Sequence, residues 1–280
     1  MTFKNYFDTM LIQKPKGTYD LLPEQSFQRT FLENKIRSIF SKFNYNEIRT
    51  PSFEKTSLFK RGIGEETDIV SKEMYSFNDN EFTLKPEMTA SVVRSYLENS
   101  LYNESPLQKL FYISNMFRRE RPQAGRFREF SQFGAEAIGS SDYLIDAEMI
   151  ILADSVLKEF GIKNASIKIN TIGTLSERTV YLSELKNYLS VYLPELSKDS
   201  QRRYEKNPLR ILDTKDAKDI EILKDAPVLF EFLSEDTKKF FENVLYALNT
   251  MNIGYEVDHK LVRGFDYYTS TTFEFISDAL

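Results

Sequence analysis

Hydrophobic residues recur at helical spacing in two long segments of the chain. Behind Pro23, a residue that suits the first turn of a helix, the apolar stripe predicts a helix that ends near Asn44. A second stripe predicts a helix that ends at Gly161, with Ser141 or Asp142 as its N-cap.

Other segments carry the alternation and the turn residues that are typical of strands. The longest predicted pair consists of extended residues 110–113 and 116–120 and a returning strand, 127–138. Shorter strands are predicted at residues 47–50, 82–84, 167–169, 254–257 and 265–276, and a further helix at 86–97. The composition of residues 59–70 indicates a loop. Because consecutive strands are joined by short loops, we expect an antiparallel α+β sheet rather than a doubly wound one.

The character of the chain changes between residues 175 and 236, where Tyr, Leu, Lys and Glu dominate and glycine is lacking. This composition favours helices. A chain of 280 residues is also long for one compact domain. We therefore expect a core formed by residues 1–174, a small helical insertion at 175–236, and a return to the core at 237–280.

Composition excludes several kinds of chemistry. The chain has no cysteine, which excludes disulfides, thiolate metal sites and cysteine nucleophiles. His259 is its single histidine, so a metal site with several histidines is also excluded. The net charge is −5, so binding of nucleic acid would need a local basic patch. No segment resembles a membrane span or a secretion signal, which predicts a soluble, cytoplasmic protein.

The predicted strand pair has one apolar and one polar face. A period of two places Phe133, Ala135 and Ala137 on the apolar face, and the polar face carries Arg118, Glu120, Gln132 and Glu136. Three interpretations are open: a solvated face, a buried network whose hydrogen bonds are satisfied, or a ligand pocket. Glutamine and glutamate beside Gly134 favour the close approach of another group.

The loop between these strands contains four arginines and no lysine. Arg119, Arg121, Arg126 and Arg128 surround Pro122 and Gly125. One guanidinium group can bind two phosphate oxygens at once, so the loop could bind a polyphosphate or an RNA backbone. The alternative interpretation is a mobile basic loop. The chain has no Walker-type glycine-rich loop, so any nucleotide would bind on the sheet through arginines.

Several segments together resemble one family. They are Lys16-Gly17-Thr18, Arg49-Thr50-Pro51, residues 61–68, Pro86-Glu87, residues 116–139 and residues 261–268. In combination they resemble the catalytic domain of bacterial histidyl-tRNA synthetases, which are class II aminoacyl-tRNA synthetases. The resemblance implies an α+β fold with an antiparallel sheet flanked by helices, and a homodimer formed through the helix and strand that end at Pro51, the region of motif 1.

The resemblance also implies an ATP site. Arg118 would hold the α-phosphate and the carboxylate of the amino acid, and Arg263 would lie beside the same phosphate as a second catalytic arginine. Glu120 would accept from the adenine amino group, Phe130 would stack on the adenine, and Arg126 would reach the terminal phosphates. Mg²⁺ would bind the outgoing pyrophosphate, with no metal site formed by the protein itself.

The implied partners of this site are L-histidine and tRNA(His). The residues that match histidine-binding positions are Glu87 and Thr89 for the α-amino group, Gln132, Glu136 and Tyr268 for the imidazole, and Arg263 and Tyr267 beside them. The implied reaction is the ATP-dependent formation of histidyl-adenylate and its transfer to tRNA(His).

The sequence departs from the family at several positions. Lys85 replaces arginine, Met88 replaces glycine, Ser131 replaces histidine and Phe265 replaces leucine. The chain also ends at Leu280, before motif 3 and the anticodon-binding domain, so we expect a truncated catalytic fragment with incomplete activity.

Two alternatives to a synthetase fragment are weighed. The histidine-binding regulatory subunit of ATP phosphoribosyltransferase shares this fold, but such proteins tend to lose the catalytic arginine and the arginine-rich loop, and this chain retains both. The third interpretation is an inert dimerising domain.

Overall fold

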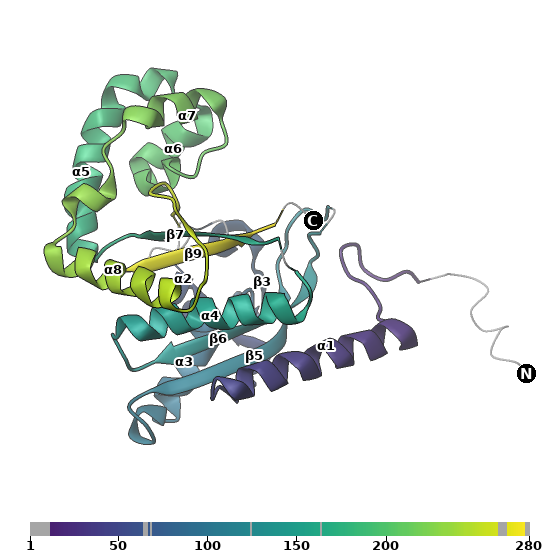
Figure 1. Ribbon diagram of the computed structural model, residues 1–280. Helices are drawn as coiled ribbons and strands as arrows, with labels where there is room; N and C mark the ends of the chain where they lie inside the picture. Colours follow the sequence, from purple (N-terminus) through teal and green to yellow (C-terminus); the bar gives the residue numbers. More distant parts are fainter. Residues whose placement is uncertain are drawn as a thin grey trace, which may run out of the picture. The chain divides into compact units, whose positions relative to one another are not determined.

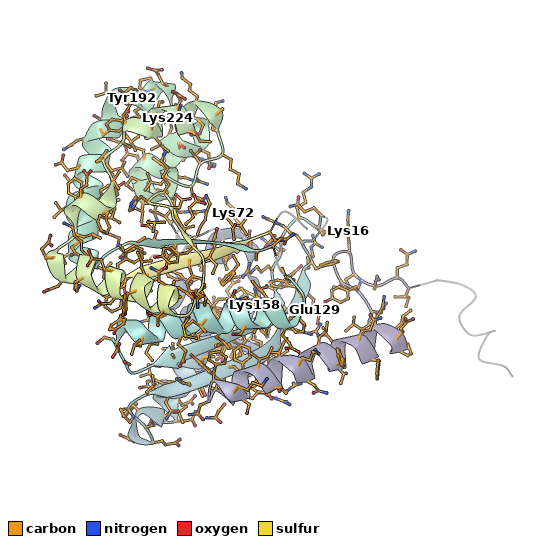
Figure 2. The ribbon with its side chains drawn as sticks, in the orientation of Figure 1. Lys16, Lys72, Glu129, Lys158, Tyr192 and Lys224 are labelled. Carbon is orange, nitrogen blue, oxygen red and sulfur yellow. The ribbon has the colours of Figure 1, made fainter. Side chains whose placement is uncertain are left out.

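The computed structural model describes residues 12–63, 67, 69–123, 125–162, 164–262 and 268–277. The chain divides into two compact units, residues 1–136 and 137–280. Figure 1 shows the path of the chain and Figure 2 its side chains.

The first unit contains two small sheets and three α-helices within its described residues. Its elements are α1 (Pro23–Lys42), β1 (Asn46–Glu47), β2 (Phe53–Lys55), α2 (Thr56–Ile63), a π-helix (Ile69–Glu73), β3 (Tyr75–Phe77), β4 (Phe82–Leu84), α3 (Thr89–Glu98), a 3-10 helix (Leu101–Asn103), β5 (Gln108–Phe117) and β6 (Glu129–Ile138). The strands pair in the orders β1-β5-β6 and β2-β4-β3. β1 is parallel to β5, whereas β4 is antiparallel to both of its neighbours.

The helix predicted behind Pro23 is confirmed as α1, and its C-terminal half packs on β5 and β6. The ring of Phe40 stacks on Phe111 with 4.8 Å between centroids, and it meets Phe133 edge-on at 6.3 Å. Phe133 belongs to the face of β6 that the sequence predicted to be apolar. Phe40 and Phe111 are buried in this contact, whereas Phe133 stays 44% exposed, and the polar groups lie on the opposite face of β6.

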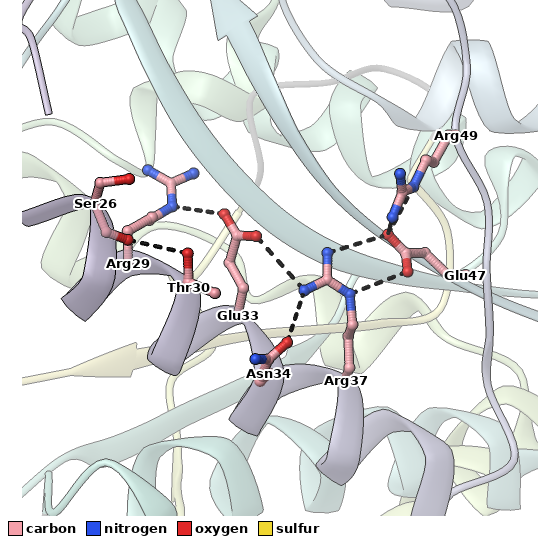
Figure 3. A network of polar contacts seen from close by, with 8 residues as sticks. All are labelled: Ser26, Arg29, Thr30, Glu33, Asn34, Arg37, Glu47 and Arg49. Atoms are coloured by element: carbon pink, nitrogen blue, oxygen red, sulfur yellow. Dashed lines mark hydrogen bonds and ion pairs between the residues drawn. The ribbon is translucent and has the colours of Figure 1, made fainter. Parts of the chain in front are cut away.

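Charged side chains connect α1 to the end of β1 (Figure 3). Arg37 contacts Glu33 at 3.5 Å and Glu47 at 3.1 Å, and Arg49 contacts Glu47 at 3.0 Å. Hydrogen bonds from the Arg37 guanidinium hold the pKa of Glu47 below its ordinary value. Because Glu47 accepts from two arginines, the helix and the strand are joined by charge-assisted hydrogen bonds.

The second unit combines a sheet with a group of short helices. Its elements are α4 (Tyr143–Glu159), β7 (Ser166–Thr171), α5 (Leu175–Tyr192), α6 (Lys198–Lys206), α7 (Ala217–Ile222), α8 (Glu235–Thr250), β8 (Glu256–Val257), β9 (Thr271–Ile276) and 3-10 helices at Leu193–Glu195, Pro208–Ile211, Leu223–Asp225 and Leu229–Phe232. The strands pair in the order β8-β7-β9, with β8 parallel and β9 antiparallel to β7.

Two helices cover this second sheet. α4 and α8 lie side by side against β7 (Figure 1). Their apolar residues form one core with the inward-facing residues of β7, and its members include Ala147, Ile150, Ile167, Ile169, Phe241, Val244 and Leu248. α4 is the helix predicted to end near Gly161. The carboxylate of Asp142 caps it by accepting from the amide of Leu144.

The segment that lacks glycine is helical, as its composition predicted. α5, α6 and α7 enclose a second apolar cluster, which includes Tyr181, Leu185, Leu189, Leu209, Ile211 and Leu223. α5 begins with a capping box between Thr174 and Glu177. The division of the chain into a core and an insertion at 175–236 stays a prediction.

Some predicted boundaries are wrong. The segment 59–70, expected to be a loop, contains the end of α2 and the start of the π-helix, because Phe59 is fully buried and anchors α2. β5 ends at Phe117, since the amide of Arg119 donates to Glu73 at 2.6 Å instead of continuing the ladder. α3 begins only at Thr89, because the carboxylate of Glu87 accepts from the amide of Ala90.

In the part of the chain that the structure describes, no helix is both long enough and apolar enough to cross a bilayer.

One buried carboxylate organises the α6–α7 region. Asp219 has no exposed surface and accepts from the amide and the hydroxyl of Ser197 at 2.8 and 2.6 Å. It also accepts from the hydroxyls of Ser200 at 2.6 Å and Thr214 at 3.0 Å. These four hydrogen bonds offset the free-energy cost of burying the carboxylate away from water.

Replacement of Asp219 by alanine is expected to lower the free energy of unfolding by about 3 kcal/mol, because four donors lose their acceptor. Urea unfolding followed by circular dichroism measures this loss. Asp199→Ala is the control: this carboxylate is half exposed and only pairs with Arg202 and Arg203, so the loss should stay below about 1 kcal/mol. Equal losses in the two variants would contradict the interpretation.

Candidate active site

Arg118 lies at the end of β5 and is held from two sides. Its Nε donates to the carbonyl of Pro86 at 2.9 Å, and its guanidinium carbon lies 5.2 Å from the centroid of the Phe130 ring on β6. One terminal nitrogen is 3.9 Å from a carboxylate oxygen of Glu120. The structure therefore brings together three residues that the sequence predicted for an ATP site, and it fixes the direction of the guanidinium.

Glu120 contacts a second arginine. Arg126 approaches its other carboxylate oxygen at 3.3 Å, and this arginine is 64% exposed, whereas Glu120 is 15% exposed. Arg126 lies in the loop between β5 and β6, where Gln123 and Arg126 form an isolated bridge. Because the pair is at the protein surface, the attraction is weak, and a phosphate could replace the carboxylate as the partner of Arg126.

Carboxylates gather beside the N-terminus of α3. The hydroxyl of Thr89 donates to Glu136 at 2.7 Å, and Glu87 accepts from the amide of Ala90 at 3.0 Å. Burial raises the pKa of Glu136 to about 7, and the charge of Glu87 acts in the same direction. Burial also raises the pKa of Glu87, while hydrogen bonds from main-chain amides and the charge of Arg118 lower it.

Glu87 connects the two groups of side chains. It is close enough to influence Glu136 and is itself influenced by Arg118. Gln132 lies between Phe130 and Glu136 on the same face of β6, because the period of a strand is two. One end of this surface offers guanidinium groups and the other offers carboxylates. A ligand with an anionic end and a hydrogen-bonding cationic end matches that distribution.

The close approach predicted at Gly134 is made by the protein itself. A side chain at this position would overlap the hydroxyl of Tyr112, a buried residue of β5. The sequence reasoning did not identify Tyr112. Its spacing of six residues from Arg118 is even, and that signal places both on one face of an extended chain.

Two departures from the family pattern surround Thr50. The hydroxyl of Thr50 contacts the sulfur of Met88 at 3.5 Å, and the ammonium of Lys85 donates to the carbonyl of Thr50 at 3.4 Å. Both side chains are buried, and burial lowers the pKa of Lys85 while the charge of Glu54 raises it. Ser131, the third departure, donates to the side chain of Asn115.

The remaining predicted site residues belong to the second unit. Tyr268 packs against the apolar cluster of α5, α6 and α7. Arg263 and Tyr267 lie outside the described residues, and so do Phe265 and part of the segment 61–68. The expected pairing of Arg118 with Arg263 across one phosphate therefore stays a prediction.

The chain is similar to one family of known proteins over most of its length. The family model described as histidyl-tRNA synthetase matches residues 17–279. A histidine–tRNA ligase of Lactococcus lactis subsp. cremoris is 46% identical over 272 residues, which is 95% of this chain and 63% of the relative. The chain thus spans less than two thirds of that relative's length.

Solved structures give the same result. The apo histidyl-tRNA synthetase of S. aureus has a TM-score of 0.75 and 36% identity, over 96% of this chain and 62% of that one. A Bacillus halodurans protein described as an ATP phosphoribosyltransferase regulatory subunit/histidyl-tRNA synthetase has a TM-score of 0.67 over 97% of this chain and 74% of that one, but with 21% identity it shows the fold alone.

The α+β fold is of the class II aminoacyl-tRNA synthetase type. Within that class, the chain belongs to the histidyl-tRNA synthetase family.

The raised pKa of Glu136 predicts a pH dependence of stability. Its pKa lies near 7 in the folded chain and near the ordinary 4.5 when unfolded, so the folded state binds more protons between these values. Stability is therefore lost as the pH rises from about 4.5 through 7. We expect the free energy of unfolding to fall by about 2 kcal/mol over this range. This is less than the whole pKa shift would give, because Glu136 keeps some solvent exposure.

Glu136→Gln should remove this part of the pH dependence. Urea unfolding at a series of pH values between 4.5 and 8, compared for the two proteins, isolates the contribution of Glu136. If the unfolding free energies of the unmodified chain and Glu136→Gln differ by the same amount at every pH in this range, Glu136 does not have the raised pKa.

Proposed function

We propose that the chain carries the site at which L-histidine is activated with ATP, giving histidyl-adenylate and pyrophosphate, before transfer of histidine to tRNA(His). The observation that carries the proposal is the position of Arg118. It is fixed by the Pro86 carbonyl and the Phe130 ring, and it lies within electrostatic range of the carboxylate cluster around Glu87.

In this reaction the carboxylate of histidine attacks the α-phosphorus of ATP. A bond forms between the carboxylate oxygen and phosphorus, and the bond to the β-phosphate oxygen breaks, so that pyrophosphate leaves. The reactants are both anions, and the site must reduce their repulsion and stabilise the charge that develops on phosphorus. Arg118 would do this with a guanidinium that is oriented before the substrates bind. The attacking carboxylate is already ionised, so no general base is required.

The other residues bind and orient the nucleotide. Phe130, which already stacks with a guanidinium, offers a flat apolar surface for adenine. Glu120 would accept from the adenine amino group, and Arg126, released from Glu120, would reach the terminal phosphates. Arg263 would be the second catalytic arginine beside the α-phosphate.

The carboxylate cluster would bind histidine. Glu87 and Thr89 would hold the α-amino group, and Gln132 and Glu136 the imidazole. The imidazole carries one donor and one acceptor and titrates near the same pH as Glu136, so the two groups can share a proton. An apolar amino acid would leave Thr89 as the partner of this half-buried carboxyl and offer it no further hydrogen bond, a mismatch that can discriminate by about 10⁴-fold or more. Tyr267 and Tyr268 are the further residues proposed for this pocket.

Mg²⁺ is proposed as part of the nucleotide substrate. Within the described ranges, no three His, Cys, Asp or Glu side chains are grouped so as to hold a metal ion. With nucleotides, Mg²⁺ is usually bound through phosphate oxygens and water.

The regulatory-subunit alternative has weaker support. It predicts histidine binding without catalysis, and its function would not require an oriented Arg118. Co-purification with a short ATP phosphoribosyltransferase catalytic subunit, together with no binding of tRNA, would favour it over the synthetase.

Histidine-dependent exchange of pyrophosphate into ATP tests the proposal. Arg118→Gln should lower the exchange rate by about 10³-fold, because a charge that acts in the transition state is removed. Arg202→Gln, at an exposed arginine of α6, is the matched control and should leave the rate unchanged. Exchange with other amino acids but never with histidine would refute the assignment.

We also propose a cytoplasmic homodimer that forms through α1. Phe27 and Phe31 on this helix are 75% and 54% exposed, and Leu22 is 63% exposed. An apolar surface of this kind on a helix indicates a partner, and a second copy of the chain is the partner that the family resemblance implies.

Introducing glutamate at both Phe27 and Phe31 should convert the dimer into a monomer, because the charges would have to be buried in the interface. Sedimentation velocity measures the change. Val191→Glu is a control with the same starting exposure of 75%, on α5, and should leave the dimer intact. A chain that stays dimeric with both glutamates on α1 would exclude this surface as the interface.

A further inference from the structure

The hairpin formed by residues 118–123 and 125–128, here called the arginine loop, is closed by main-chain hydrogen bonds. The amide of Arg118 donates to the carbonyl of Arg128 at 2.9 Å, and near the tip Gln123 and Arg126 exchange bonds of 3.3 and 2.9 Å. A two-stranded hairpin has little stability by itself. Further contacts are therefore needed to hold the loop in one orientation.

Arg128 supplies such contacts to a segment far away in the sequence. Its amide donates to the carbonyl of Gly17 at 2.7 Å, and one terminal guanidinium nitrogen donates to the carbonyl of Lys16 at 3.3 Å. Lys16, labelled in Figure 2, precedes Arg128 by 112 positions. The Nε of Arg128 donates to the carbonyl of Glu120 at 3.2 Å. The side chain of Arg128 thus joins Lys16 to Glu120 of the arginine loop, and its amide adds a bond to Gly17.

Gly17 permits this approach. Its φ is +90°, a backbone conformation that residues with a side chain rarely adopt. An added Cβ would lie 2.9 Å from the Cγ of Arg128 and 3.0 Å from the Cγ of Pro122. A neighbouring contact closes the same junction, since the rings of Tyr19 and Phe127 meet edge-on at 5.0 Å. A substitution at Gly17 must therefore displace Arg128, the loop or the N-terminal segment.

We propose that Gly17 and Arg128 form a latch through which the segment before α1 positions the arginine loop. Arg128 is then a positioning residue: two of its guanidinium nitrogens bind main-chain carbonyls and orient the main chain of Glu120. The carboxylate of Glu120 in turn contacts Arg118 and Arg126. The latch therefore sets where Glu120 and the guanidinium of Arg126 lie, while Arg118 is held separately by the Pro86 carbonyl and the Phe130 ring. Its effect on ATP rests on the proposed function, whereas its effect on the order of the loop does not.

The test uses Gly17→Ala and Arg128→Met, which break the latch from opposite sides. Gly161→Ala is the control for the glycine, because Gly161 also has a positive φ, +74°, but open space around it. Arg202→Met is the control for the arginine. The first readout is the rate of native-state cleavage by trypsin after Arg126, followed by mass spectrometry alongside thermal unfolding. The second is the binding of MgATP and of histidine by calorimetry.

Each latch variant should be cleaved about tenfold faster than its control and should bind MgATP about tenfold more weakly, since the hydrogen bonds that hold the loop are lost. Histidine affinity should change by less than about twofold, because the carboxylate cluster does not involve the latch. The double variant should be no worse than the more affected single variant, since both changes break one interaction.

The possible results distinguish failure of the latch hypothesis from failure of the proposed function. Cleavage and ATP affinity equal to those of the controls would overturn the latch. Faster cleavage of the latch variants, with no MgATP binding by any protein including the unmodified chain, would support the latch and refute the proposed function. Loss of histidine and ATP binding in equal measure would also overturn the latch, because that result indicates a general loss of structure.

Discussion

The hydrogen bond from the Nε of Arg118 to the carbonyl of Pro86, with the Phe130 ring beside it, is the interaction on which the site depends. It joins the end of β5, the start of β6 and the turn before α3. A half-buried guanidinium keeps its charge at any relevant pH. The free-energy cost of removing this charge from water must therefore be offset by hydrogen bonds and by nearby carboxylates. Glu120 and Glu87 supply those charges. The positive and negative groups of the site are therefore interdependent.

The same interdependence explains the raised pKa values. Glu87 and Glu136 lie near each other and are shielded from water, so both are harder to ionise than an exposed glutamate. Thr89 and the first amides of α3 offset only part of that cost. A cationic or hydrogen-bonding ligand would offset the rest, which gives the carboxylate cluster a physical preference for an amino group or an imidazole.

Much of the first unit could be predicted from local sequence. The apolar stripe of α1 and the alternation of β6 each depend on nearest neighbours, and Phe40 meets Phe133 as those patterns require. In the second unit, capping is also local, and Asp142, one of the two predicted caps, is the residue that caps α4. The prediction of a loop at residues 59–70 is wrong because it rests on the glycines and acidic residues of the segment, whereas the burial of Phe59 depends on tertiary packing. The junction of Gly17 with Arg128 could not be predicted, since no periodicity relates residues that are more than a hundred positions apart.

The central claim is that one polar face binds both substrates, with Arg118 at the phosphate and Glu136 at the imidazole. A crystal structure of the chain with histidine and a non-hydrolysable ATP analogue tests it most directly. The account predicts the guanidinium of Arg118 within hydrogen-bonding distance of the α-phosphate, the adenine on Phe130, and the imidazole against Glu136. A nucleotide bound elsewhere, or histidine seated away from the carboxylate cluster, would contradict it.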